Sequence, residues 1–239
     1  TEVFTTFEGD NTVLLQLMAK SLLTGYKRHL TEMSVLDLAR HGTVPVINGL
    51  SDLLHPCQAL TDYFTLVEKK QELKGRKIAY VGDGNYMCHS LIYGAIKFGM
   101  DIAVATPESL APKAIIVKSA NREAKQSGSK ITVTHDPAAA VEGADAVYTD
   151  VWVSMGEESL FDERIRLLRP YQVNADLVAA TGHLDDGKLI FLHCLPSFHD
   201  ANTEVTSEIG ALEVTDEVFS AAYSKVFDQA ENRLHTAKA

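Results

Sequence analysis

Residues 77–105 read KIAYVGDGNYMCHSLIYGAIKFGMDIAVA, and this stretch decides the fold. It contains two apolar strands around one helical pattern: Lys77 to Val81, Met87 to Phe98, and Asp101 to Ala105. Gly99 directly follows the helical pattern, which is typical of a helix end. Two strands joined through a helix pair in parallel, with a right-handed crossover. The stretch therefore predicts one strand–helix–strand unit of an α/β sheet.

The same alternation continues on the C-terminal side. We expect a helix at 112–126, a strand at 131–134, a short helix at 137–141, and strands at 144–149 and 189–193. Strands that alternate with helices indicate a parallel sheet with helices on both faces. The predicted fold class is α/β, with a doubly wound parallel sheet.

The N-terminal side is less complete. Residues 60–73 predict a helix, with Leu60, Phe64 and Val67 on one apolar face. Only 54 residues precede His55, whereas a typical domain needs about 100 to 150. An incomplete helical N-terminal segment is therefore expected before the sheet domain.

Composition excludes several classes of protein. The chain has 239 residues and a net charge of -10, which argues against nucleic-acid binding because phosphate neutralisation needs clustered lysine and arginine. The three cysteines follow no metal-binding spacing and are odd in number, so a reduced cytoplasmic compartment is expected. No apolar run approaches the roughly 18 residues of a membrane helix, and the N-terminus lacks the basic start of a signal peptide. We expect no metal, no cofactor and no membrane association.

Two polar clusters stand where ligands bind in open α/β sheets, near strand ends, and a third precedes the amphipathic segment. They are His193-Cys194-Leu195-Pro196 after an apolar strand, Asp150-Val151-Trp152-Val153-Ser154-Met155-Gly156 after another, and His55-Pro56-Cys57-Gln58 before the amphipathic segment. Residues 46–52 and 226–233 carry two further motifs. Together and in this order, the motifs resemble those of the ornithine carbamoyltransferases.

The resemblance covers about residues 33–239 and implies a function. Family members transfer a carbamoyl group from carbamoyl phosphate to the δ-amine of L-ornithine, giving citrulline and phosphate. They belong to arginine metabolism and amino-acid biosynthesis, and they are homotrimers that form sites between subunits. The expected partners are therefore the two substrates and other copies of the chain.

The resemblance also assigns site residues. Those expected to bind carbamoyl phosphate are His55, Gln58, Cys194, Leu195 and Arg233. Those expected to bind ornithine are Asn85, Tyr86, Asp150, Ser154 and Met155. The two residues expected to be catalytic are Cys194 and His55.

The chemistry of these side chains fits the assignment. Carbamoyl transfer needs donors on the carbonyl oxygen, and His55 and Gln58, spaced i, i+3, can aim an imidazole and an amide at one point. By resemblance, the sulfur of Cys194 lies beside the δ-amine and Leu195 offers a backbone carbonyl to the carbamoyl amide. No activating constellation accompanies the thiol, so a covalent nucleophile is disfavoured. The alternative for Cys194 is a small buried hydrophobic residue.

Other positions also have plain alternatives. Asp150 could meet an α-amino group, with residues 154–156 as a closing loop, or it could cap a helix. Arg233 matches an arginine that binds carbamoyl phosphate in the family, and its alternative is a solvated surface residue. The run from Gly82 to Met87 begins like a dinucleotide fingerprint, but Met87 replaces the third glycine, which disfavours nucleotide binding.

Two departures from the family predict impaired activity. The Ser-x-Arg-Thr-Arg phosphate motif does not occur in the sequence, and each charge-assisted bond is worth roughly 1.5 to 3 kcal/mol. Tyr86 stands where the family has a second asparagine, which holds the α-carboxylate. A non-catalytic α/β binding or assembly domain is the alternative function.

Residues 1–30 resemble the C-terminal helical domain of acyl-CoA oxidases and dehydrogenases. Glu8 would then be a catalytic base, although the residues after Asp10 also suit an ordinary capped helix, which we favour. A flavin-dependent acyl-CoA oxidoreductase is the weakest function considered. The expected domains are a helical segment of foreign origin at 1–32, a remnant of a carbamoyl-phosphate domain with its linking helix at 33–73, and an ornithine-binding α/β domain at 74–239.

Overall fold

The computed structural model describes residues 35–153 and 158–238. The chain divides into two compact units, Thr1–Asn48 and Gly49–Ala239. In the described part of the first unit, helix α3 spans Val35–His41. All other described elements belong to the second unit.

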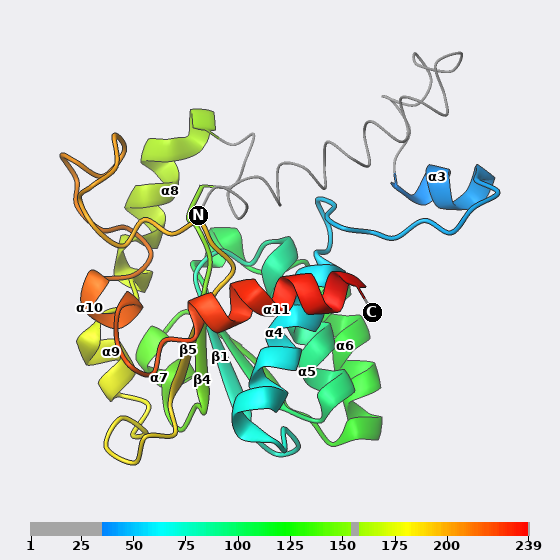
Figure 1. Ribbon diagram of the computed structural model, residues 1–239, viewed down its shortest axis with the longest axis horizontal. Coiled ribbons are helices and arrows are strands. Elements are labelled where there is room, and N and C mark those ends of the chain that lie inside the picture. Colours follow the sequence, from blue (N-terminus) through cyan, green and yellow to red (C-terminus); the bar gives the residue numbers. More distant parts are fainter. Residues whose placement is uncertain (1–34, 154–157, 239) are drawn as a thin grey trace. The chain divides into compact units, whose positions relative to one another are not determined.

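The second unit is built on one sheet of five parallel strands (Figure 1). The strands are β1 Lys77–Val81, β2 Asp101–Ala105, β3 Ile131–Thr134, β4 Ala146–Thr149 and β5 Ile190–His193. Their spatial order is β3-β2-β1-β4-β5, and every pair is parallel. The strand order reverses direction at the β1–β4 pair. In doubly wound sheets, ligands bind in the crevice at such a switch point.

Helices cover both faces of this sheet, as the sequence predicts. One face carries α4 Pro56–Lys70, α5 Tyr86–Phe98, α6 Ala114–Ser127 and α11 Val226–Lys238. The other carries α7 Pro137–Val141, α9 Ala175–Ala179 and α10 Asp216–Phe219. Helix α8 (Phe161–Leu168) follows the 3-10 turn Glu158–Leu160, and two more such turns lie at Glu108–Leu110 and Arg169–Tyr171. Each face of the sheet packs against its own hydrophobic core, and alternate residues of β1 point into the two cores. Ile78 and Tyr80 belong to the first core, and Ala79 and Val81 belong to the second.

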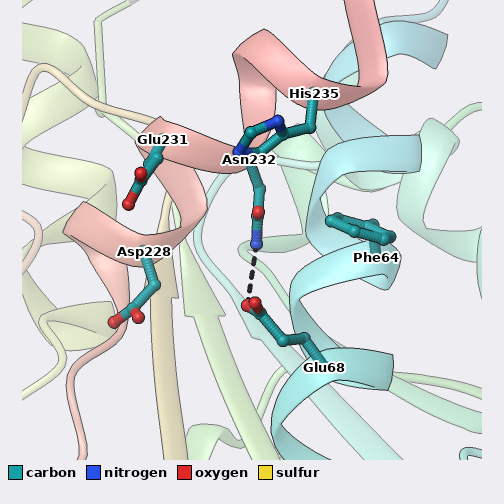
Figure 2. Close-up of a pocket in the computed structure, with 6 residues that line it drawn as sticks. All are labelled: Phe64, Glu68, Asp228, Glu231, Asn232 and His235. Carbon is teal, nitrogen blue, oxygen red and sulfur yellow. Dashed lines mark hydrogen bonds between the residues drawn. The ribbon is translucent and has the colours of Figure 1, made fainter. Parts of the chain in front are cut away.

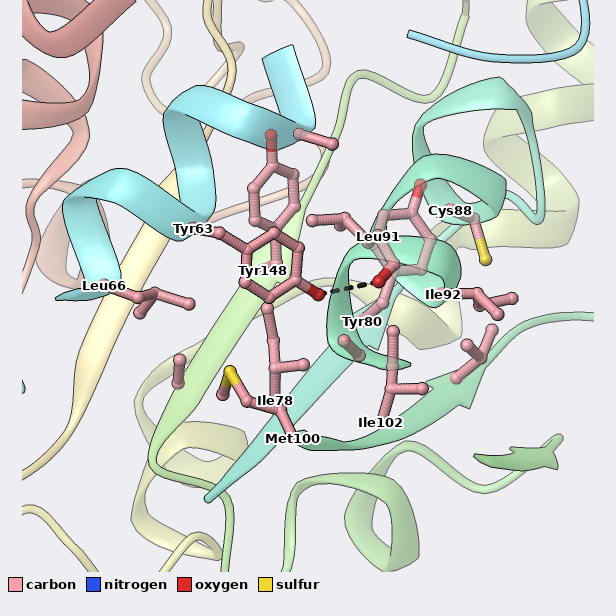
Figure 3. Packing of buried hydrophobic residues seen from close by; sticks show 14 of the residues in the cluster. Tyr63, Leu66, Ile78, Tyr80, Cys88, Leu91, Ile92, Met100, Ile102 and Tyr148 are labelled. Carbon is pink, nitrogen blue, oxygen red and sulfur yellow. Dashed lines mark hydrogen bonds between the residues drawn. The ribbon is translucent and has the colours of Figure 1, made fainter. Parts of the chain in front are cut away.

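The first core contains three buried tyrosines, Tyr63, Tyr80 and Tyr148 (Figure 3). Tyr63 on α4 donates its hydroxyl to the carbonyl of Leu91 on α5 at 2.6 Å, so its polar end is satisfied. The ring lies directly against Gly94, where an added Cβ would stand 2.0 Å from it. A glycine at this position is what allows α4 and α5 to approach so closely.

The helix predicted at 60–73 needs a correction. It begins at Pro56 and ends at Lys70, and its buried face differs from the predicted one. Leu60 and Phe64 are 51% and 41% exposed, whereas Tyr63 and Leu66 are buried. Proline is well suited to a first helical position, which explains the earlier start.

Helix α5 agrees closely with its predicted range. The side chain of Asn85 caps its start by accepting from the backbone N–H groups of Met87 and Cys88 at 2.8 and 3.3 Å. Gly99 ends the helix in the left-handed conformation, at φ 70°. No helix among the described residues is long and apolar enough to span a membrane.

Candidate functional site at the switch point of the sheet

Three predicted site residues meet at the carboxyl ends of β1, β4 and β5. Asp150, which follows β4, accepts from the amide of Asn85 at 3.2 Å and from the thiol of Cys194 at 2.9 Å. Its own neighbour Val151 donates a backbone N–H to the same carboxylate at 2.8 Å. Asp150 is only 3% exposed. The carboxylate is therefore held by three donors at the switch point, and it caps no helix among the described residues.

The strand ends themselves are tied together around this carboxylate. The hydroxyl of Thr149 donates to the carbonyl of Val81 at 2.7 Å, joining the ends of β4 and β1. Beside them, Nη1 of Arg164 on α8 donates to Oδ2 of Asp83 at 2.9 Å and forms an ion pair with it. Gly84 is required here, because an added Cβ would stand 2.4 Å from the carbonyl oxygen of Leu110.

Cys194 is a protonated thiol in this setting. Burial and the neighbouring carboxylate of Asp150 raise the pKa of the Cys194 thiol well above its usual value. It donates to that carboxylate, as the 2.9 Å contact shows. A thiol with a raised pKa is a poor nucleophile, so the geometry favours a polar contact role over covalent catalysis.

Leu195 is held in a left-handed backbone conformation, at φ 56°. This conformation is unusual for a residue with a side chain and occurs mostly where the surroundings enforce it. Its N–H donates to Nδ1 of His193 at 2.9 Å, and the following bond to Pro196 is cis. The turn after β5 is therefore fixed by the ring of His193.

His193 lies beside a buried carboxylate that was not predicted from the sequence. Nε2 of His193 lies 3.3 Å from Oε1 of Glu213, and both side chains are fully buried. Because Nδ1 accepts from Leu195, a neutral ring carries its proton on Nε2, facing Glu213. Glu213 also accepts from Ser197 and Phe198, at 3.0 and 2.6 Å, which anchors the chain beyond the turn.

His55 directly precedes α4, at its N-cap position. Its backbone N–H donates to the hydroxyl of Ser90 at 2.7 Å, and Ser90 in turn donates to the carbonyl of Tyr86. Burial, and next the charge of Arg233, lower the pKa of His55 to about 4. The imidazole is therefore neutral at physiological pH.

Tyr86 and Arg233 both lie near His55. The rings of His55 and Tyr86 are 6.3 Å apart between centroids. Arg233, on α11, lowers the pKa of His55 through its charge, and its Nη1 atom is buried without a hydrogen-bond partner among the described residues. Arg233 is thus partly buried toward the site, unlike a solvated surface arginine.

The side chain of Gln58 forms a hydrogen bond within α4. Its amide donates to Asp62 at 2.8 Å, and Asp62 also receives the amide of Gln229 on α11 at 2.6 Å. Burial raises the pKa of Asp62 to about 7, against the opposing effect of these two amides. Asp62 and Gln229 were not among the predicted site residues. The sequence held a signal for each: Asp62 follows Gln58 by four residues, and Gln229 lies within the motif at 226–233.

The remaining predictions have different outcomes. Ser154 and Met155 lie outside the described residues. Among the described residues, no group of three or more histidine, cysteine or acidic side chains is placed to hold a metal.

A pocket between α4 and α11 has an acidic lining that shares no residue with the predicted site: Phe64, Glu68, Asp228, Glu231, Asn232 and His235 (Figure 2).

Comparison with known proteins identifies both parts of the chain. Residues 74–239 match the Asp/Orn binding domain of aspartate/ornithine carbamoyltransferases, and residues 11–68 match the carbamoyl-P binding domain of the same proteins. The second match overlaps the segment predicted to be foreign. The comparisons do not support the resemblance of residues 1–30 to acyl-CoA oxidases, so that prediction and the flavin enzyme are set aside.

Curated relatives and solved structures agree with these matches. The catabolic ornithine carbamoyltransferase of Bacillus licheniformis is 53% identical over 212 residues, covering 86% of this chain and 62% of the relative. The ornithine carbamoyltransferase of Pyrococcus horikoshii is 48% identical and covers 86% and 60%. The structure of the Pyrococcus furiosus enzyme aligns with a TM-score of 0.74 at 48% identity, over 85% of this chain and 60% of that one.

The chain spans about three fifths of the length of the curated relatives it matches. The sheet order, the polar groups at its switch point and the domain matches all point the same way. The chain belongs to the aspartate/ornithine carbamoyltransferase family.

Proposed function

We propose that this chain is the amino-acid-binding part, with a portion of the carbamoyl-phosphate part, of an ornithine carbamoyltransferase. The reaction transfers the carbamoyl group of carbamoyl phosphate to the δ-amine of L-ornithine and releases citrulline and phosphate. The observation that carries the proposal is the cluster of Asn85, Asp150 and Cys194 at the switch point. Residues 74–239 would form the ornithine-binding domain, in agreement with the matched range.

The cluster suits the amino-acid substrate. The carboxylate of Asp150 lies at a strand end, where Cys194 and Val151 donate to Oδ1 and Asn85 donates to Oδ2. Oδ2 keeps a second lone pair that can accept from an α-ammonium group. The Cys194 thiol remains protonated beside it. A neutral thiol adds no charge near the δ-amine, which must itself be neutral to attack the carbonyl carbon.

The carbamoyl side of the site would use His55, Gln58, Leu195 and Arg233. A neutral imidazole can donate one N–H to the carbonyl oxygen, where negative charge develops during attack. The amide nitrogen of Gln58 donates to Asp62, so Gln58 would not act as the donor to the carbonyl oxygen that its spacing from His55 suggested. Its Oε1, at the opposite end of the amide, would instead accept from the carbamoyl NH2 group. Arg233 would supply positive charge toward the phosphate.

We further propose slow turnover for the chain of 239 residues. Because no Ser-x-Arg-Thr-Arg motif occurs in it, several charge-assisted phosphate contacts of roughly 1.5 to 3 kcal/mol each are missing. Their loss corresponds to at least about a thousandfold in rate. The comparison is with a relative of full length under the same conditions.

The cellular setting is also a proposal. The cysteines described are free, which fits a reducing cytoplasm, and family resemblance suggests a homotrimer. Several relatives are named catabolic ornithine carbamoyltransferases, which favours arginine degradation over the biosynthetic role. Light scattering after size-exclusion chromatography would measure the oligomeric state directly.

The function is tested by citrulline formation from labelled carbamoyl phosphate and L-ornithine. The parent should form citrulline above the protein-free blank, and Cys194→Ala should abolish it without unfolding the chain. Cys88→Ala, which removes a buried thiol from the first core, is the matched control and should behave as the parent. Equal activity in Cys194→Ala would contradict the assignment, and no citrulline from any variant would favour a non-catalytic binding or assembly domain.

A further inference from the structure

A buried carboxylate lies behind the site, on α4. Asp62 is fully buried one helical turn after Gln58, and its Oδ1 accepts from the amides of both Gln58 and Gln229. Burying a carboxyl group is costly unless hydrogen bonds compensate it. Two amide donors on Oδ1, at 2.8 and 2.6 Å, offset part of that cost, whereas Oδ2 is buried without a hydrogen-bond partner among the described residues.

The orientation of each amide follows from a single backbone donor. The N–H of His193 donates to Oε1 of Gln229 at 3.0 Å, and an N–H group cannot accept. Oxygen must therefore face β5, so the NH2 end of Gln229 faces Asp62. Since Oδ1 of Asp62 accepts there, it also receives the NH2 end of Gln58.

These bonds connect three elements that contribute to the site. The chain runs from Gln58 and Asp62 on α4, through Gln229 on α11, to the backbone of His193 at the end of β5. The next two residues are Cys194 and Leu195. The position of the Gln58 amide is thereby coupled to the turn that carries the thiol.

We propose that Asp62 is a positioning residue. It bonds to the amide of Gln58 directly and, through Gln229, keeps that amide aligned with the Cys194–Leu195 turn. This proposal rests on the proposed function, because its consequence is the placement of groups around a carbamoyl substrate. Asp62 itself touches no substrate. It sets which end of the Gln58 amide faces the site.

Ionisable groups from each packed element surround Asp62. Tyr63 lies on α4, Tyr148 on β4, Cys194 after β5 and Arg233 on α11, and each interacts electrostatically with Asp62. Burial raises the pKa of Asp62 to about 7, and the charge of Arg233 opposes that rise. The network therefore changes its protonation near neutral pH, which provides a readout that does not depend on catalysis.

The first measurement is a pH titration of side-chain amide resonances by NMR. The NH2 signals of Gln58 and Gln229, assigned by their loss in Gln58→Glu and Gln229→Glu, should move together with a midpoint near pH 7. Asp62→Asn, which keeps the shape of the side chain, should abolish the shared titration. Independent or flat titrations in the parent would overturn the proposal.

The second measurement is calorimetric binding of phosphonoacetamide, an unreactive analogue of carbamoyl phosphate. Asp62→Ala should weaken binding by about tenfold, the equivalent of about 1.4 kcal/mol, and Asp62→Asn should restore most of the affinity. Thr65→Val is the matched control, since Thr65 is equally buried and bonds to Asn232 on α11 at 3.1 Å. Parent-like binding by Asp62→Ala would refute the positioning role.

The two proposals fail in different ways. A parent that neither binds phosphonoacetamide nor forms citrulline refutes the proposed function, and the amide titration alone then decides whether Asp62 orders the two glutamines. If Asp62→Ala does not fold, Gln229→Glu carries the binding test. Gln229→Glu places a second acceptor against Asp62, so it should weaken phosphonoacetamide binding, and unchanged affinity would contradict the proposal.

Discussion

Replacing Asp62 by asparagine should remove a pH dependence from the stability of this chain. Asp62 is completely buried on α4, and burial raises its pKa from 3.8 to about 7. A carboxyl group whose pKa is raised by folding binds its proton more tightly in the folded state than in the unfolded state. Its contribution to stability is therefore fully present below pH 3.8 and is lost as the pH rises through about 7.

The size of the effect follows from the shift in pKa. The difference between about 7 and 3.8 is close to three units, and each unit corresponds to 1.36 kcal/mol, giving about 4 kcal/mol. Asparagine does not titrate. The free energy of unfolding of Asp62→Asn, minus that of the parent, should therefore increase by about 4 kcal/mol between about pH 4 and pH 8.

Urea unfolding at several pH values measures this difference. The chain has one tryptophan, Trp152, which is 1% exposed, so its fluorescence reports unfolding. His55 acts in the opposite sense, because its lowered pKa makes stability fall as the pH falls from 6.5 through about 4. That contribution is common to both proteins and cancels in the difference. A difference that does not change with pH would refute the reasoning.

Three further outcomes are expected. Tyr86→Asn should strengthen L-ornithine binding in calorimetry by about ten- to hundredfold, because a compact amide suits the α-carboxylate; Tyr86→Phe is the control, and equal or weaker binding by Tyr86→Asn contradicts the idea. Gly94→Ala should lower the free energy of unfolding by about 1 to 3 kcal/mol, since the new Cβ meets the Tyr63 ring; parent-like stability in urea would show that α4 and α5 adjust. The 239-residue chain should form citrulline at least about a thousandfold more slowly than a full-length relative, and comparable turnover in the same assay would be inconsistent with this.

The sheet was predictable because its signals are local. Strands β1, β2 and β5 are short apolar runs, and a terminating glycine or a proline follows closely in the sequence. The region between β4 and β5 was not predicted in detail. Its helices, such as α9 at Ala175–Ala179, are too short to show a helical period.

The exposed face of α4 shows why periodicity misled. Leu60 and Phe64 share a face in the sequence pattern, yet they are 51% and 41% exposed in this structure. The face that packs on the sheet unit carries Tyr63 and Leu66 together with the polar Gln58 and Asp62. A buried carboxylate satisfied by another helix is a product of tertiary packing, which a pattern within one helix does not reveal.

The candidate site likewise contains residues that local sequence signals predict and residues that only tertiary packing brings in. Asn85, Asp150 and Cys194 were predictable because the carboxyl ends of parallel strands meet at one edge of a sheet. Glu213 and Gln229 were not assigned, since neither follows a strand: Glu213 lies 3.3 Å from the ring of His193, and Gln229 accepts from the backbone N–H of His193. The sequence thus indicated the groups that meet at the strand ends better than the groups that orient them.

Binding of L-ornithine to the Asp150 cluster is the most direct test of the proposed site. Calorimetry with phosphonoacetamide present should show L-ornithine binding to the parent, and Asp150→Asn should weaken it by about tenfold or more, because a charge-assisted bond to the ammonium is lost. Asp136→Asn, at the exposed cap of α7, is the matched control and should bind as the parent does. No ornithine binding by the parent, or equal binding by Asp150→Asn, would contradict the assignment of this site.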